Sequence, residues 1–202
     1  RVVLAYVDHQ LQDKTEEQWG VVQRFADSFG LRAIKLVVNP VEVRSGGGLE
    51  DGARRERFRL LTALKQEMEI DVIALAHHKD DQVETFFIRL THGSRIFGLR
   101  GIDDQREDLV RPLLAFSKCE LSEYAKTYRL EVVEDPTNRE LDSLRNRIRH
   151  SALPAFDGVF GIGWRNKLIQ LMQALRLRSK LEILDAENFL GESCIKVRGG
   201  YT

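Results

Sequence analysis

The chain has 202 residues, of which 43% are hydrophobic and 31% are charged, and its formal net charge is zero. This is the composition of an ordinary soluble protein, and it excludes low-complexity classes. No apolar run approaches the ~20 residues that a membrane span needs, and the N-terminus lacks the signature of a signal peptide. Two distant cysteines, Cys119 and Cys194, indicate no disulfide framework and favour a cytoplasmic location.

Strands and helices are predicted to alternate along the first half of the chain. Apolar runs predict strands at residues 2–7, 33–38 and 71–76, the last of them buried. Apolar residues at helical spacing predict a helix after each strand, at residues 19–29, 49–68 and 83–90. This alternation predicts an α/β fold with a Rossmann-like parallel sheet and helices on both faces.

The second half is predicted to be more irregular and more basic. Residues 93–108 are predicted to form a loop. Ser117 to Glu120 form a capping-box pattern that predicts a helix from there through Tyr128, and 131–133 are predicted to form a short strand. A basic helix at 141–153 is expected to end at Pro154, and a glycine-containing break at 158–163 precedes a long helix at 165–189 and a strand at 193–198. We therefore expect a domain of residues 1–154 and a linker helix with the start of a further segment at 155–202.

The stretch Ala76-His-His-Lys-Asp-Asp-Gln-Val-Glu-Thr85 is the first place to look for chemistry, because ligands of open α/β sheets bind at the carboxyl ends of strands. His77, His78, Asp81 and Glu84 are three or four residues apart, so most of them project to one side of the following helix. They could ligate a divalent metal, act as acid and base, or serve structure alone by facing the helix dipole. The spacing favours a functional cluster.

Two other features have plain structural alternatives. Ser45-Gly-Gly-Gly48 lacks the preceding buried strand and the Gly-Lys-Ser/Thr of a phosphate loop, so it is interpreted as a linker. Residues 139–180 hold nine lysines and arginines against three acids, which suggests a polyanionic partner. Arg145 and Arg149 lie four residues apart and could contact successive phosphates, but salt bridges with Glu134, Asp135 and Asp142 are the simpler reading.

Seven short motifs follow one another along residues 2–154. They are Val7-Asp8-His9-x-Leu11, Leu49-Glu50 through Arg54 with Arg57-Phe58, His77-His-x-x-Asp81-x-x-Glu84-Thr85, Gly98-Leu-x-Gly101, Arg111-Pro-Leu-Leu114, Glu134-Asp-Pro-Thr-Asn138 and Arg145-Asn-Arg-Ile-Arg149. In this order they resemble the tRNA(Ile)-lysidine synthetases, a branch of the PP-loop ATP pyrophosphatases.

The resemblance implies a ligase that uses ATP and Mg²⁺. It would adenylate the wobble cytidine of a tRNA(Ile) with a CAU anticodon, and the ε-amine of free L-lysine would then displace AMP. Asp81, oriented by His77 or His78 and accompanied by Glu84, is the expected catalytic group, with metal ligation as its rival role. Asp8 and His9 are expected beside the nucleotide. The expected tRNA or phosphate contacts are Arg54, Arg111, Arg145, Asn146 and Arg149. No protein metal site is predicted, and a homodimer is a candidate assembly.

One departure from the family pattern affects these expectations. The Ser-Gly-Gly-x-Asp-Ser loop that cradles pyrophosphate in this family should precede Arg1, and Ser45–Asp51 does not replace it. The chain as given is therefore expected not to turn over ATP by itself. Two alternatives stay open: a metal-dependent phosphohydrolase that uses His77, His78 and Asp81, and a non-catalytic RNA-binding fragment.

Overall fold

The computed structural model describes residues 2–10, 15–39, 43, 49–133, 143–193, 196–197 and 200–201, without the side chains of residues 49–50 and those from 187 onward. Contacts divide the chain into two compact units. The first unit is Arg1–His77 with Asp104–Ser143, and the second is His78–Asp103 with Leu144–Thr202. No helix among the described residues is long and apolar enough to cross a membrane.

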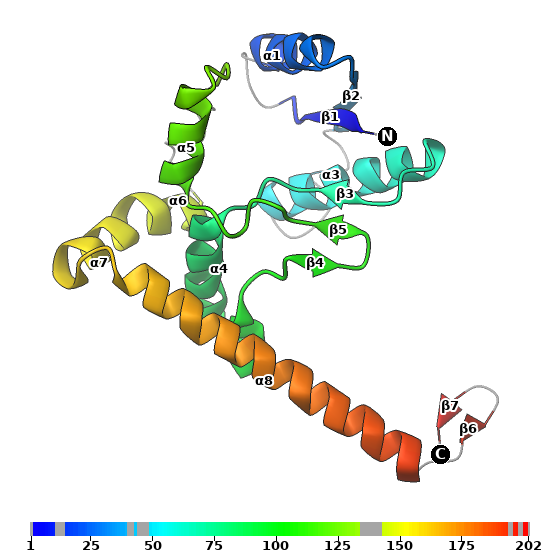
Figure 1. Ribbon diagram of the computed structural model, residues 1–202, viewed down its shortest axis with the longest axis vertical. Helices are drawn as coiled ribbons and strands as arrows, with labels where there is room; N and C mark the ends of the chain where they lie inside the picture. Colours follow the sequence, from blue (N-terminus) through cyan, green and yellow to red (C-terminus); the bar gives the residue numbers. More distant parts are fainter. Residues whose placement is uncertain are drawn as a thin grey trace. The chain divides into compact units, whose positions relative to one another are not determined.

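The first unit contains two groups of paired strands. Strand β1 (Val3–Asp8) pairs in parallel with β2 (Arg32–Val37), and helix α1 (Thr15–Ser28) lies beside this pair (Figure 1). Tyr6 of β1 donates a hydrogen bond from its hydroxyl to Gln18 of α1 at 2.8 Å. Strand β3 (Ile73–Ala74) pairs in parallel with β5 (Leu109–Val110), to which β4 (Gln105–Arg106) is antiparallel. The prediction of an α/β fold with parallel strands is confirmed.

Two helices complete the described part of the first unit. Helix α3 (Leu49–Glu67) agrees with the predicted helix at 49–68. Helix α5 (Lys118–Thr127) begins after Ser117, whose hydroxyl accepts the Glu120 N–H at 3.2 Å while the Glu120 carboxylate accepts the Ser117 N–H at 2.7 Å. The predicted capping box is therefore confirmed. The glycine-rich loop at 45–48 lies outside the described residues.

Helix α4 (Lys79–Thr91) lies at the centre of the second unit. It contacts η1 (Ile96–Arg100), α6 (Leu144–Arg147), the π-helical turn η3 (Ile148–Ala152) and α8 (Trp164–Ser193). The core consists of Val83, Ile148 and Leu153. Phe87 of α4 extends it, because its ring centroid lies 5.4 Å from that of Phe156 and 6.0 Å from that of Trp164. Helix α7 (Leu153–Phe160) precedes α8, and β6 (Lys196–Val197) pairs with β7 (Gly200–Tyr201).

Four predicted elements are corrected by the structure. The strand at 71–76 shrinks to β3 and is not buried, because β5 offers it only two paired residues; Val72 is 45% exposed. Residues 131–133 form no strand. The loop at 93–108 contains η1 and β4. The helical path does not end at Pro154, which lies in the first turn of α7, where a missing N–H is tolerated.

The domain boundary predicted near residues 154–163 stays a prediction. The break itself is shorter than expected, since α7 extends to Phe160 and α8 begins at Trp164.

Gly101 follows η1 in a conformation that only glycine adopts readily, with φ 79° and ψ −158°. A Cβ at this position would collide with Oε1 of Gln82 and lie 3.2 Å from the Met172 sulfur. The Gln82 side-chain amide also holds this loop in place. It accepts a hydrogen bond from the Ile102 N–H at 2.6 Å and donates one to the Ile102 carbonyl at 2.8 Å. We expect Gly101→Ala to lower the free energy of unfolding by about 2–4 kcal/mol, from backbone strain and the broken Gln82 contacts.

The matched control for this prediction is Gly161→Ala. Gly161 has a similar backbone conformation, with φ 68° and ψ 154°, but a Cβ there would meet no atom within 4 Å. Strain alone should lower the free energy of unfolding by about 1–2 kcal/mol. Urea unfolding of the two variants measures the difference, and equal losses would show that the contact with Gln82 contributes nothing.

Candidate active site on helix α4

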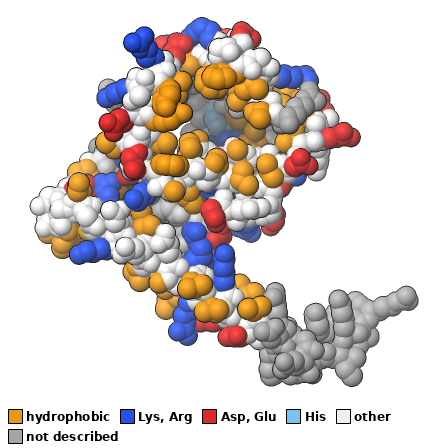
Figure 2. All heavy atoms as spheres, viewed as in Figure 1, with side chains coloured by type: hydrophobic (Ala, Val, Ile, Leu, Met, Phe, Trp, Pro, Cys, Tyr) orange, Lys and Arg blue, Asp and Glu red, His pale blue; other side chains and the backbone are white. Residues whose placement is uncertain are grey.

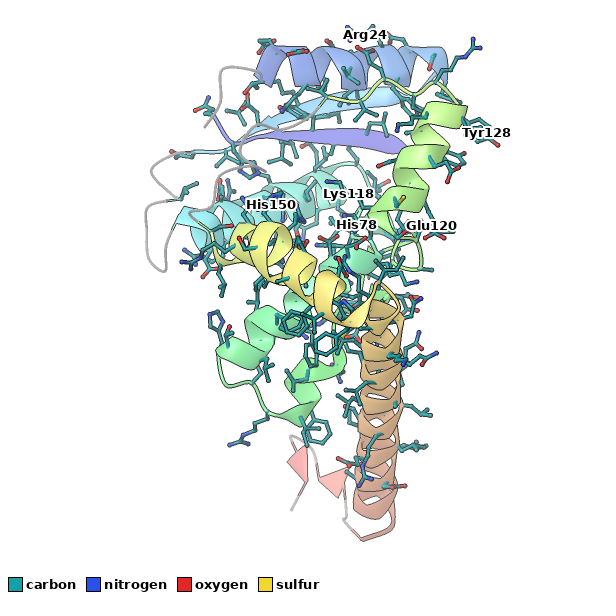
Figure 3. The ribbon with its side chains drawn as sticks, turned by 90° about the vertical axis from the view of Figure 1, so that its left-hand side faces the viewer. Arg24, His78, Lys118, Glu120, Tyr128 and His150 are labelled. Atoms are coloured by element: carbon teal, nitrogen blue, oxygen red, sulfur yellow. The ribbon has the colours of Figure 1, made fainter. Side chains whose placement is uncertain are left out.

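The first turn of α4 holds two acids, Asp80 and Asp81, at the positive end of the helix dipole, which stabilises negative charge. His78 precedes the helix in an extended conformation, and its N–H donates to the Asp81 carboxylate at 2.8 Å. Asp81 thereby caps the helix, because it satisfies one of the donors near the helix start. Figure 3 labels His78 at this end of α4.

Glu84, one turn later, is almost completely buried, with 1% of its surface exposed. Its two carboxylate oxygens accept hydrogen bonds from Nε and Nη2 of Arg149 at 2.6 and 2.9 Å. Arg149 lies on η3, 65 residues further along the chain. Such a bidentate pair fixes the orientation of the carboxylate.

Two further contacts join this pair into a network. Nη2 of Arg149 lies 3.6 Å from Oδ1 of Asp81, and Nε of Arg145 lies 3.8 Å from Oε2 of Glu84. We call Asp81, Glu84, Arg145 and Arg149 the α4 cluster. Burial acts to lower the pKa of Arg149, but the hydrogen bonds and charge of Glu84, with the charge of Asp81, outweigh it, so the pKa is raised. The cluster therefore brings two carboxylates close to two guanidinium groups.

The salt bridges that sequence reasoning suggested for Arg145 and Arg149 involved Glu134, Asp135 and Asp142, which lie outside the described residues. The structure instead pairs these arginines with two acids predicted as catalytic. Arg145 is less engaged than Arg149, because its Nε makes no hydrogen bond with any described residue. Asn146 lies between them, half-buried on α6.

The two histidines fall in different units. His77 ends the first segment of the first unit, and His78 begins the second. In the second unit, Nε2 of His78 lies 3.6 Å from Oδ2 of Asp81, and Nδ1 lies 3.6 Å from Oδ2 of Asp80. The part of the chain that the structure describes contains no group of three or more His, Cys, Asp or Glu side chains that could hold one metal ion.

The remaining predicted residues belong to the first unit. Asp8, 6% exposed, ends β1, where its Oδ1 accepts the Gln10 N–H at 2.8 Å and its Oδ2 lies 3.3 Å from Nζ of Lys35. His9 follows it and is half-buried. Arg54 is exposed on α3, with its guanidinium 5.2 Å from the Phe58 ring. Arg111 is 8% exposed, which disfavours contact with a large polyanion.

Sequence reasoning missed an ion-pair set at the corner between α7 and α8. Arg165 donates from Nε and Nη2 to Asp157 at 3.0 and 2.5 Å, and from Nη1 to Asp80 of α4 at 2.8 Å. The hydrogen bond from Arg165 is the main cause that lowers the pKa of Asp157. The same bond is the main cause that raises the pKa of Arg165. Asp80 is adjacent to Asp81 in sequence, but no spacing pattern pointed from it to residue 165.

Comparison of the chain with known proteins identifies its family. Residues 1–156 match the family model described as the PP-loop domain. The chain belongs to the PP-loop domain family. One solved structure has a similar fold: the U34-tRNA thiolase NcsA from Methanococcus maripaludis matches over 86% of this chain and 61% of its own, with a TM-score of 0.69 and 14% sequence identity. At that identity the likeness concerns the fold alone.

Among curated PP-loop relatives, the tRNA(Ile)-lysidine synthase of Persephonella marina is 31% identical over 78% of this chain and 35% of its own length. The bifunctional protein TilS/HprT of Listeria monocytogenes is 33% identical over 76% of the chain and 24% of its own length. The tRNA(Ile)-lysidine synthase of Neisseria meningitidis is 32% identical over 89% of the chain and 43% of its own length. The chain thus spans between 24% and 43% of the length of these relatives. The resemblance to this branch is confirmed.

Proposed function

We propose that the protein containing this chain is an ATP-dependent tRNA-modifying enzyme that attaches lysine to the wobble cytidine of tRNA(Ile). The observation that carries the proposal is the agreement between the collinear motifs and relatives named tRNA(Ile)-lysidine synthase over 76–89% of the chain. The charged α4 cluster supports it, because a motif shared with that family forms a buried polar site here.

The proposed reaction has two steps. The C2 oxygen of the cytidine attacks the α-phosphate of ATP and releases pyrophosphate, which gives an adenylated base. The ε-amine of lysine then attacks C2, loses a proton and displaces AMP. An amine with a pKa near 10.4 is neutral in fewer than about 0.1% of molecules at pH 7, so the second step needs a base or a desolvated pocket.

Asp81 is the proposed base. Its side chain is 10% exposed, and it is held by the His78 N–H and by the charge of Arg149. Glu84 is less suited to the role, because both of its oxygens are engaged by Arg149. We assign to Glu84 and Arg149 the task of holding the first turn of α4 in place.

Phosphate contacts are proposed for Arg145, because 29% of its side chain is exposed, and for Arg54, because it is exposed. Asn146 and Arg111 stay weaker candidates for the tRNA, and Asp8 and His9 remain proposed neighbours of the nucleotide. The described residues offer no three-donor site for Mg²⁺, so none of them is assigned as its ligand. Mg²⁺ in such enzymes is commonly held largely by substrate phosphates.

The test is incorporation of labelled lysine into tRNA. The purified protein that contains this chain is incubated with ATP, labelled lysine and a tRNA(Ile) transcript with a CAU anticodon, and the label in tRNA is counted. A transcript with uridine in place of the wobble cytidine is the control and should take up no label. Absence of label from both transcripts, or equal label in both, would contradict the proposed reaction.

A further inference from the structure

Arg165 links the corner between α7 and α8 to the first turn of α4. It is the second residue of α8, and it holds Asp157 of α7 with two nitrogens and Asp80 of α4 with the third. The corner is secured independently, since the Trp164 indole N–H also donates to Asp157 at 2.9 Å. The contact with Asp80 is therefore not needed to explain how the corner is built.

The setting of these contacts differs from that of an ordinary surface ion pair. The side chains of Arg165, Asp157 and Asp80 are 25%, 24% and 21% exposed. By contrast, the Arg24–Glu131 pair, which is also bidentate, is 60% and 54% exposed, and exposed pairs contribute little. A planar guanidinium that donates from three nitrogens to two carboxylates also fixes the orientation of both carboxylates, which a flexible lysine would not do.

The first turn of α4 is thus held from two sides. Arg149 engages Asp81 and Glu84, while Arg165 engages Asp80, the residue directly before Asp81. The first turn of a helix has the fewest internal hydrogen bonds, so external contacts decide how well it is ordered. If the contact between Arg165 and Asp80 is lost, Arg149 is the one of these two arginines that still contacts the turn.

We propose that Arg165 is a positioning residue, which acts through Asp80 to hold the first turn of α4, and with it Asp81, in the reactive orientation. This proposal rests on the proposed function for its catalytic consequence, but the ordering of the turn does not depend on it. Misplacement of a reacting group by about 1 Å from a distant change can cost about 100-fold in rate.

The test compares Asp80→Asn, Arg165→Gln and the double variant in the protein that contains this chain. We expect each single variant to lower kcat of lysine incorporation about 10- to 100-fold, with KM for ATP and tRNA changed less than about twofold. The double variant should be no worse than either single variant, because one contact is removed in all three. Arg165→Lys should recover part of the rate, since it retains a charge near Asp80.

The control is Arg24→Gln, which removes the exposed bidentate pair of the first unit and should leave kcat unchanged. Hydrogen exchange of the backbone amides of residues 78–85 supplies a readout apart from activity, and it should quicken in both single variants. If Asp80→Asn behaves as the unsubstituted protein in rate and exchange while Arg165→Gln is impaired, Arg165 acts only through Asp157 and the proposal is overturned. If the unsubstituted protein makes no lysidine, the proposed function fails, while the exchange data still decide whether Arg165 orders the turn.

Discussion

Replacing Arg149 with methionine should lower the free energy of unfolding of the second unit by about 3–5 kcal/mol, since removal of one partner strands a buried charge. Glu84 would keep only 1% of its surface in contact with water, and its nearest remaining cation would be Arg145 at 3.8 Å. Methionine fills a similar volume without the charge, so lost packing adds little.

Fluorescence of Trp164 during urea unfolding measures this loss. The chain has two tryptophans, and a Trp19→Phe background leaves Trp164, which packs against Phe87 and Phe156 in the second unit, as the reporter. Arg147→Met is the matched control, since Arg147 is exposed on the neighbouring α6, and it should change the free energy of unfolding by less than about 0.5 kcal/mol.

The double variant Glu84→Gln with Arg149→Met sharpens this prediction. It removes both charges, so it should regain a substantial part of the stability that Arg149→Met loses. If Arg149→Met is no less stable than Arg147→Met, the pair with Glu84 makes no net contribution.

Replacing Asp81 with asparagine should lower lysine incorporation by about 10²- to 10⁴-fold, the range expected for loss of a general base. Asparagine has nearly the same shape, and its carbonyl oxygen can still accept the His78 N–H that Asp81 accepts at 2.8 Å. The fold and the helix start should therefore survive, as circular dichroism would show, while the charge that takes a proton from lysine is lost.

Two measurements separate this role from a structural one. Asp81→Asn should still form the adenylated tRNA, because the base is needed only when lysine attacks, so tRNA-dependent release of pyrophosphate persists while lysine incorporation falls. Asp185→Asn is the control, since Asp185 is an exposed acid on α8. Near-normal incorporation by Asp81→Asn, or loss of both steps together, would remove Asp81 from the role of base.

Local patterns predicted the elements that local interactions create. The Ser117–Glu120 capping box and the end of α1 before Gly30, which has φ 61°, depend only on neighbouring residues and are confirmed. The strand predicted at 131–133 failed because a strand also needs a partner, which periodicity does not reveal. Glu131 instead bonds to Arg24 of α1, 107 residues earlier.

The candidate site shows the same limit. Spacing within α4 placed Asp81 and Glu84 on one side of a helix, but it did not show what covers that side. Both sides are buried, because Arg149 and Arg145 cover the acids as Val83 enters the core. Arg145 and Arg149 lie 61 and 65 residues after Glu84. Pairings over such distances depend on the tertiary fold, and no single-sequence pattern contains them.

The π-helical turn η3 lies between Arg147 and Pro154, so its length sets the position of Arg149 in the α4 cluster relative to Pro154. Inside an α-helix, Pro154 would meet the carbonyl of residue 150, four positions before it. Here the Leu153 N–H bonds to the Ile148 carbonyl, five positions back, and the helical path continues into α7. Such a turn holds one residue more than an α-helical turn. A one-residue deletion there would rotate Arg149 by roughly 100° relative to α7, because each α-helical residue turns the chain by that angle. The segment's length is therefore as constrained as its chemistry.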